Sequence, residues 1–240
     1  MDIPAPTLNN LSGGRVLNVA TGNGNFIHYL IENLGSFEEV IGVDTSEKHV
    51  IAFEKAFTGK PVRFIKMNAE KIEFPDACFD TVSISNSLHH MASLEQVLSE
   101  MRRVLTPGGY FIASEMFSDN QAETQMTHVL LHHWWAAIDR AQGISHNETF
   151  TRQQLLKILS GLALIEISVD TNSDLSSDPK DAETIKYLID VTDQYLQRLE
   201  GLPSEDALRA RGMELRQRLE ETGFHGATNL LFVGKLGNDH

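Results

Sequence analysis

One short segment of this 240-residue chain carries its strongest chemical signal. Residues 15–25 read Arg-Val-Leu-Asn-Val-Ala-Thr-Gly-Asn-Gly-Asn. The apolar residues at its start predict a buried strand, the two glycines predict a turn, and the apolar spacing that follows predicts a helix. A strand, a glycine turn and a helix in this order present backbone N–H groups to a nucleotide-like ligand. The segment therefore predicts a cofactor site.

An acidic residue reinforces this interpretation. Asp44 ends the next expected strand, 39–44, about twenty residues after the turn, as in other α/β nucleotide sites. A carboxylate at this place can accept hydrogen bonds from both hydroxyls of a ribose. The plainer alternative is that Asp44 caps the helix that follows.

The spacing of the glycines separates the cofactor classes that use such a turn. A phosphate-binding loop needs Gly-Lys-Ser/Thr, which does not occur in the chain. The dinucleotide fingerprint G-x-G-x-x-G fails in both registers, because its third glycine falls on Ile27 or on Asn25. Residues 18–24 are instead similar to the acidic-x-Gly-x-Gly-x-Gly turn of class I S-adenosylmethionine-dependent methyltransferases. Asn18 stands in place of the acid, and Ala20 in place of the first glycine.

Further blocks extend the resemblance over residues 14–116. Asn-Ala-Glu at 68–70 and Phe-Pro-Asp-Ala-Cys-Phe-Asp at 74–80 are similar to runs of this family. Asn-Ser-Leu-His-His at 86–90 and Arg-Arg-Val-Leu-Thr-Pro-Gly-Gly at 102–109 resemble the type 11, UbiE-like subgroup. The blocks occur in the order and spacing of that subgroup.

The resemblance implies S-adenosylmethionine as cofactor and S-adenosylhomocysteine as product. The residues at matching positions, and so expected to bind the cofactor, are Asn18, Ala20, Thr21, Gly22, Asn23, Gly24, Asp44, Thr45, Asn68, Ala69, Glu70, Asn86 and Ser87. Residues 18–24 would hold the methionine part, and Asp44 the ribose. Asn68 and the N–H of Ala69 would face the adenine. Asn86 and Ser87 would border the site of methyl transfer.

The elements that must position these residues alternate between strand and helix, which is typical of a parallel sheet covered on both faces. The resemblance implies an α/β, Rossmann-like, doubly wound sheet of seven strands, mostly parallel, with an antiparallel last strand. The expected strands are 15–19, 39–44, 62–67, 78–85, 110–115, 162–169 and 229–236. Helix starts are expected at Ser46, at a Ser93–Gln96 capping box, at a Thr151–Gln154 capping box, and at Asp178-Pro179.

Four segments follow from this pattern. Residues 1–14 are a lead-in without periodicity, 15–170 the cofactor-binding core, and 227–240 the last strand and tail. Residues 171–226 replace a short connection with two amphipathic helices. We expect this helical insertion to be a lid over the substrate pocket or a dimer contact, in place of the helices that the family often places before its first strand. A surface ornament is the remaining alternative.

Composition narrows the partners and the compartment. A net charge of −13 argues against nucleic acid, because phosphate binding relies on Lys and Arg. No apolar run is long enough for a membrane span, and the N-terminus lacks the pattern of a signal peptide. A lone Cys78 cannot form an internal disulfide. We expect a cytoplasmic protein that acts on a small molecule, with a homodimer as one possible state.

Histidines are the other candidates for chemistry. His128 and His132 share one face of an expected helix, 121–140, and are spaced to hold a metal. No third or fourth ligand is evident, so we expect no metal, and an aromatic-rich helix over the substrate pocket is the favoured interpretation. His89 and His90 are either a surface pair at a helix start or residues that face the cofactor, one of them acting as general base. We assign no catalytic residue.

The function implied by the resemblance is in-line transfer of a sulfonium-bound methyl group to a small-molecule acceptor. The Asn-Pro-Pro-Tyr motif of methyltransferases that act on bases or glutamine is absent, since Ser-Leu-His follows Asn86. Two alternatives stay open. Asn18, Ala20 and Asn68 are consistent with a non-catalytic or degenerate protein that kept the fold. A nicotinamide oxidoreductase is disfavoured by the missing third glycine.

Overall fold

A seven-stranded sheet forms the centre of the computed structural model, which describes residues 5–238. The first four residues of the expected lead-in lie outside this range. The strands are β1 Arg15–Val19, β2 Glu39–Asp44, β3 Val62–Lys66, β4 Phe79–Ser85, β5 Leu105–Met116, β6 Ile165–Asn172 and β7 Asn229–Lys235. Their order is β3-β2-β1-β4-β5-β7-β6, and β7 runs antiparallel to both of its neighbours. The expected fold class is confirmed.

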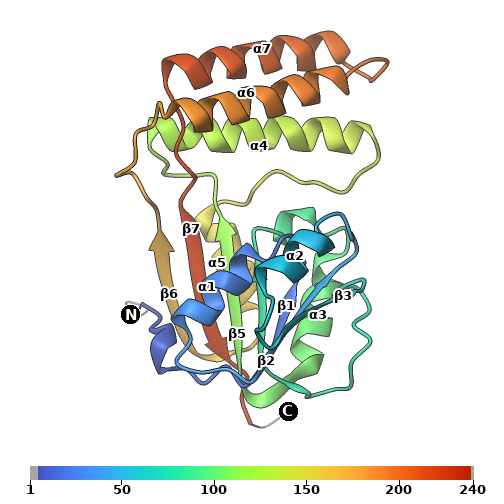
Figure 1. The fold of residues 1–240 in the computed structure, drawn as a ribbon, viewed down its shortest axis with the longest axis vertical. Helices are drawn as coiled ribbons and strands as arrows, with labels where there is room; N and C mark the ends of the chain where they lie inside the picture. Colours follow the sequence, from blue (N-terminus) through green and yellow to red (C-terminus); the bar gives the residue numbers. More distant parts are fainter. Residues whose placement is uncertain (1–4, 239–240) are drawn as a thin grey trace.

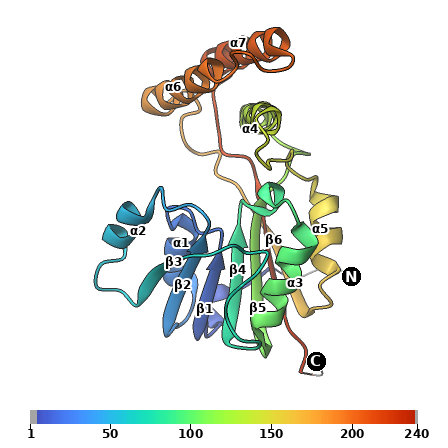
Figure 2. The same ribbon diagram turned by 90° about the vertical axis from the view of Figure 1, so that its right-hand side faces the viewer.

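Helices cover both faces of this sheet. They are α1 Asn25–Asn33, α2 Val50–Ala56, α3 Leu94–Val104, α4 Glu123–Ala141, α5 Arg152–Ser160, α6 Ala182–Gln197 and α7 Glu205–Glu221. The pair α1 and α2 lies on one face, and α3 and α5 lie on the other (Figures 1 and 2). Side-chain alternation along β1 feeds both cores, since Val16 packs on the α1 side and Leu17 on the α3 side.

The remaining three helices form a separate layer beyond the carboxyl ends of the parallel strands (Figures 1 and 2). We call α4, α6 and α7 together the helical cover. Its own apolar core includes Leu131 and Trp134 of α4, Leu196 of α6 and Leu215 of α7. The insertion between β6 and β7 therefore packs on α4, a helix from a distant part of the chain.

Local signals at the helix starts were only partly right. The Thr151–Gln154 capping box is present in full: Thr151 Oγ1 accepts from the N–H of Gln154, and the Gln154 side chain accepts from the N–H of Thr151. Ser93 stands at the start of α3, but its side chain makes no capping hydrogen bond, so the box predicted there was wrong.

Two predicted helix starts were misplaced. Ser46 does not begin α2; its hydroxyl accepts from the N–H of Lys48 in a turn before the helix. Asp178 likewise binds the N–H of Lys180, while Asp181 caps α6 by accepting from Thr184. In both places an earlier residue that can cap a turn was mistaken for the helix cap. No helix between residues 5 and 238 is long and apolar enough to cross a membrane.

The contact between α7 and α4 depends on a residue without a side chain. Gly212 is buried, and a Cβ added there would lie 2.4 Å from the ring of Trp134 and 2.7 Å from Leu196. Only glycine lets the two helices approach this closely.

We predict that Gly212→Ala lowers the free energy of unfolding by about 1–2 kcal/mol, because overpacking at Trp134 outweighs the gain in helix propensity. Urea denaturation followed by circular dichroism measures this. The matched control is Met213→Ala on the same helix, whose side chain is 54% exposed and which should change stability by less than about 0.5 kcal/mol. A stabilised Gly212→Ala variant would contradict the packing described.

Candidate active site

A cavity of about 490 Å³ lies at the carboxyl ends of β1, β2 and β4. Open α/β sheets bind their ligands at this edge, and the volume suits a nucleoside-sized molecule. Nine of the thirteen residues expected to bind a cofactor line it: Ala20, Gly22, Asp44, Thr45, Asn68, Ala69, Glu70, Asn86 and Ser87. Segments far apart in the sequence therefore meet at one site.

Four of the expected residues do not line the cavity, and each has a structural role instead. Asn18 is buried within the sheet and donates from Nδ2 to Ser83 Oγ at 3.0 Å. Thr21 is buried, with its side chain close to Gly42. The side chain of Asn23 accepts from the N–H of Asn25 at the start of α1. These side chains stabilise the turn through contacts within the protein and not through the cavity.

Gly24 is the fourth of them, and its backbone explains the glycine. Its φ is 88°, in the left-handed region, and an added Cβ would lie 2.5 Å from the ring of Phe57. Gly22 also has a positive φ, 52°, but nothing lies within 4 Å of where its Cβ would be. This open space in the turn is where a ligand can lie against the backbone.

Ala20 occupies the left-handed region as well, with φ 52°. An alanine there carries a strain on the order of 1–2 kcal/mol that a glycine would not. Ala20 also lines the cavity, so its methyl group occupies a position where a glycine would have no side chain.

Asp44 connects the turn to the end of β2. Its Oδ2 accepts from the N–H of Gly22, and its Oδ1 from the N–H of Ser46, each at 2.9 Å. It does not cap α2, which begins at Val50. Because each carboxylate oxygen has two lone pairs, both oxygens can still accept from a ligand's hydroxyl groups.

The segment after β3 forms the opposite wall. The Oδ1 of Asn68 accepts from the N–H of Glu70 at 2.9 Å, so the side chain that was expected to face an adenine also closes a local turn. Asn86, after β4, has φ 43°, and its Oδ1 accepts from the N–H of Met116. Both asparagines hold the wall in place through backbone contacts.

A buried carboxylate fixes the turn that follows β4. Glu115 of β5 is 1% exposed, and its Oε2 accepts from the N–H groups of Ser87 and Leu88, each at 3.0 Å. Its Oε1 forms a short hydrogen bond with Nδ1 of His89, which is fully buried. The pair keeps His89 in the protein interior, whereas His90, the next residue, lines the cavity.

Sequence reasoning missed several residues of the wall. Met91 and Ala92 come directly after the matched block 86–90, so their position next to it was the available signal. His90, for which a place facing the cofactor was one of two alternatives, also lines the cavity. Ser145 comes from the loop of residues 142–151 between α4 and α5. The local sequence of that loop did not indicate a role in the site. The loop reaches the cavity only because α4 packs above the sheet and the chain returns from it. No residue of α6 or α7 is among those lining this cavity.

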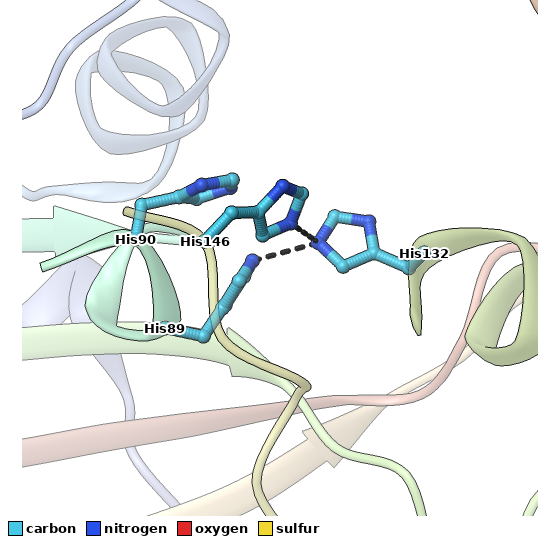
Figure 3. A group of neighbouring side chains, drawn as sticks. All are labelled: His89, His90, His132 and His146. Carbon is cyan, nitrogen blue, oxygen red and sulfur yellow. Dashed lines mark hydrogen bonds between the residues drawn. The ribbon is translucent and has the colours of Figure 1, made fainter. Parts of the chain in front are cut away.

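The same loop brings histidines together beside the cavity. His146 and His132 of α4 meet His89 and His90, so that one ring nitrogen from each lies within 4.8 Å of the others (Figure 3). His128, the expected partner of His132, is not in this group. Its Nδ1 instead accepts from the N–H of Ala227 at 2.9 Å.

Burial keeps several of these rings neutral. Loss of solvent around His90, together with the neighbouring His89 and His146, lowers its pKa to about 3. Burial lowers the pKa of His132 to about 2 and also lowers the pKa of His146, although Asp139 opposes the shift at His146. At pH 7 these rings carry a free lone pair. His90 is a weak base, however, because its pKa lies far below that pH.

A larger cavity, of about 910 Å³, lies elsewhere. It opens between α3 and α5 and is lined by residues such as Leu98, Arg102, Ile158 and Leu162. None of the residues expected to bind the cofactor lines it, and it lies away from the carboxyl ends of the parallel strands. We therefore centre the candidate site on the smaller cavity.

The position of Ser87 and His89 should depend on Glu115. We predict that Glu115→Ala lowers the free energy of unfolding by about 3–5 kcal/mol, because it leaves buried donors without their acceptor. Glu115→Gln keeps an oxygen in place and should lose only about 1–2 kcal/mol. Urea denaturation of both variants tests this, and equal stability of the two would show that the carboxylate does not organise the turn.

Comparison with known proteins shows that the part of the chain around this site is similar to methyltransferases. Residues 17–113 match a family model described as a methyltransferase domain. The ubiquinone/menaquinone biosynthesis C-methyltransferase UbiE of Geobacter sulfurreducens is 36% identical over 107 residues, which are 43% of this chain and 42% of that protein. The demethylmenaquinone methyltransferase of Thermus thermophilus is 38% identical over 103 residues, 42% of this chain and 46% of that protein. The matches thus span less than half the length of these curated relatives.

Among solved structures, the YcgJ protein of Bacillus subtilis has the same fold. It aligns with a TM-score of 0.60 over 93% of this chain and 92% of that one, at 18% sequence identity. The likeness in fold covers nearly the whole chain, whereas the family model matches residues 17–113.

Proposed function

We propose that this chain, which carries a methyltransferase domain over residues 17–113, is an S-adenosylmethionine-dependent methyltransferase that acts on a small molecule. One observation carries the proposal. The glycine turn, Asp44, the 68–70 segment and the turn after β4 all line one cavity at the carboxyl edge of the sheet. This is the arrangement that the family motifs imply, and the open space at Gly22 fits an approaching ligand.

The cofactor would bring the reactive methyl group as a sulfonium, which is already electrophilic. The protein's part is then to position the acceptor in line with that bond and to exclude water. Gly22 and the turn around it would hold the methionine portion, Asp44 the ribose, and Ala69 the adenine. We assign no general base, because His89 is buried in its pair with Glu115 and His90 is a weak base.

A small-molecule acceptor agrees with the charge and with the shape of the site. The net charge of −13 disfavours nucleic acid. The two curated relatives are named as methyltransferases of ubiquinone/menaquinone biosynthesis and of demethylmenaquinone, but each match covers less than half of this chain. Since the cover lies on the side where an acceptor would enter, the acceptor of this chain can differ from theirs.

The organisation of the chain follows from this. Residues 15–170 would form the catalytic core with 227–240, after the 1–14 lead-in, and residues 171–226 would hold α4 and its following loop over the acceptor side. This makes the insertion a support for α4 rather than a wall of the cavity itself. The lone free Cys78 is consistent with a reducing, cytoplasmic setting.

Calorimetric titration tests the cofactor. We expect S-adenosylmethionine and S-adenosylhomocysteine to bind in the micromolar range, with NAD not binding. Asp44→Ala should weaken that binding by about 10-fold or more, the value of one or more hydrogen bonds to a charged group. Glu47→Ala is the matched control, an exposed carboxylate three residues on that does not line the cavity.

The contrary outcomes are distinct. If folded wild-type protein bound neither adenosyl compound, the degenerate-fold alternative would replace the methyltransferase. Binding of NAD alone would favour an oxidoreductase. Equal affinity in wild type and Asp44→Ala would place the ligand somewhere other than this cavity.

Sedimentation equilibrium tests the role of the insertion. If α6 and α7 serve to hold α4 in place and form no dimer contact, Tyr187→Glu/Met213→Glu should sediment as the wild type does. These two side chains are the exposed large apolar residues on α6 and α7, at 65% and 54% exposure. A wild-type dimer that this double variant dissociates would assign the insertion to a dimer contact instead.

A further inference from the structure

Three histidine side chains converge beside the cofactor cavity on one point. They come from three separate segments: His89 from the turn after β4, His132 from α4, and His146 from the following loop. The Nε2 of His132 lies 2.7 Å from Nε2 of His89 and 3.1 Å from Nε2 of His146 (Figure 3). His89 and His146 are almost completely buried.

The other nitrogen of two of these rings is already occupied. Nδ1 of His89 faces the carboxylate of Glu115, and Nδ1 of His146 lies 2.7 Å from Oδ2 of Asp139. A carboxylate only accepts, so each Nδ1 carries the proton, and in a neutral ring Nε2 is then a bare lone pair. Arg198 donates to the second oxygen of Asp139 and holds that carboxylate in place.

Hydrogen bonds alone cannot satisfy this arrangement. The Nε2 of His132 either carries one hydrogen or offers one lone pair, so at most one of its two close contacts is a proper hydrogen bond. Its Nδ1 is buried and has no partner among residues 5–238. Such a half-satisfied buried polar cluster is costly to a fold. A cation at the centre would turn the three converging lone pairs into a favourable interaction.

We propose that His89, His132 and His146 bind a divalent transition-metal ion of the zinc class through their Nε2 atoms. Imidazole nitrogen suits zinc and its neighbours in the first transition row. Histidine ligands of metals regularly donate their other N–H to a carboxylate, as His89 and His146 do to Glu115 and Asp139.

Two of the three nitrogen–nitrogen distances are close to those of a zinc site. Two nitrogens bound tetrahedrally to zinc at 2.0–2.1 Å stand about 3.3 Å apart. The 3.1 Å contact is close to that spacing, and the 2.7 Å contact must open by a few tenths of an ångström. Three protein ligands leave a fourth position, and a ring nitrogen of His90 is the nearest further donor.

His90 also lines the cofactor cavity, so the ion would lie beside the site of the proposed reaction. The metal proposal itself stands on the side chains alone and holds whether or not the protein transfers methyl groups. The spacing on α4 had suggested His128 and His132 as a pair of metal ligands. In the proposed site only His132 is a ligand, because His128 binds the N–H of Ala227 instead.

Titration of the full-length protein with Zn²⁺ alone tests the site. Protein without an affinity tag is stripped with a chelator, and zinc binding is followed by calorimetry and Co²⁺ binding by its visible absorption. We expect one saturable equivalent in the wild type and a rise in Tm on loading. His132→Ala and His146→Ala should abolish it, and Asp139→Asn should weaken it about 10–100-fold as a loss of ligand orientation.

His133→Ala is the matched control, the next residue on α4, whose ring bonds to Thr149 rather than to the cluster. It should bind zinc as the wild type does. Circular dichroism confirms that each variant is folded. Absence of a saturable equivalent in folded wild type overturns the proposal without any variant, and so does unchanged affinity in a folded His132→Ala.

Discussion

The site depends on a single buried carboxylate. A carboxylate that is 1% exposed is several kcal/mol less stable than in water unless its environment replaces the lost hydration. Glu115 recovers this through two backbone N–H groups and the ring of His89. Those contacts fix the turn after β4, which supplies one wall of the cofactor cavity and the first ligand of the proposed metal site. One residue on β5 thus positions two neighbouring sites.

Asp44 has a comparable position at the other wall. By binding the N–H groups of Gly22 and Ser46, it holds the glycine turn against the end of β2. The residue that would bind a ribose therefore also shapes the turn that would hold the rest of the cofactor. Because Asp44 has both roles, a variant at this position would lose affinity for the cofactor in two ways. It would lose the hydrogen bonds to the ribose, and the glycine turn would be held less firmly.

The core of the fold could be predicted from the sequence because its signals are local. The apolar run at β1, the glycines that follow it and the apolar spacing of α1 each predict a local conformation without reference to the rest of the chain. The order and spacing of the blocks predict a methyltransferase-like core, and a family model described as a methyltransferase domain matches residues 17–113. The caps at Ser46 and Asp178 failed because a side chain that can cap a helix can equally close a turn just before it.

What the sequence could not give is where distant segments meet. Ser145 and His146 lie in a loop without periodicity, and only the crossing of α4 above the sheet returns that loop to the cavity. On α4 itself, the four-residue spacing pointed to His128 and His132 as a pair. The structure directs His128 to the backbone of Ala227 and His132 to His89, which is 43 residues away in sequence. Spacing on one helix shows which side chains share a face, and not what that face meets.

The helical cover has its own apolar core, separate from the two cores of the sheet, and this has a consequence for motion. Its core residues, such as Leu131, Leu196 and Leu215, pack on one another rather than on the strands. Groups of elements that bury their apolar surface among themselves tend to open and exchange their amide hydrogens as one cooperative unit. The three helices are therefore expected to open as one unit with their interior intact, and what such opening must break are the contacts of α4 with the edge of the sheet, those of His132 with His89 and of Val129 with Met116.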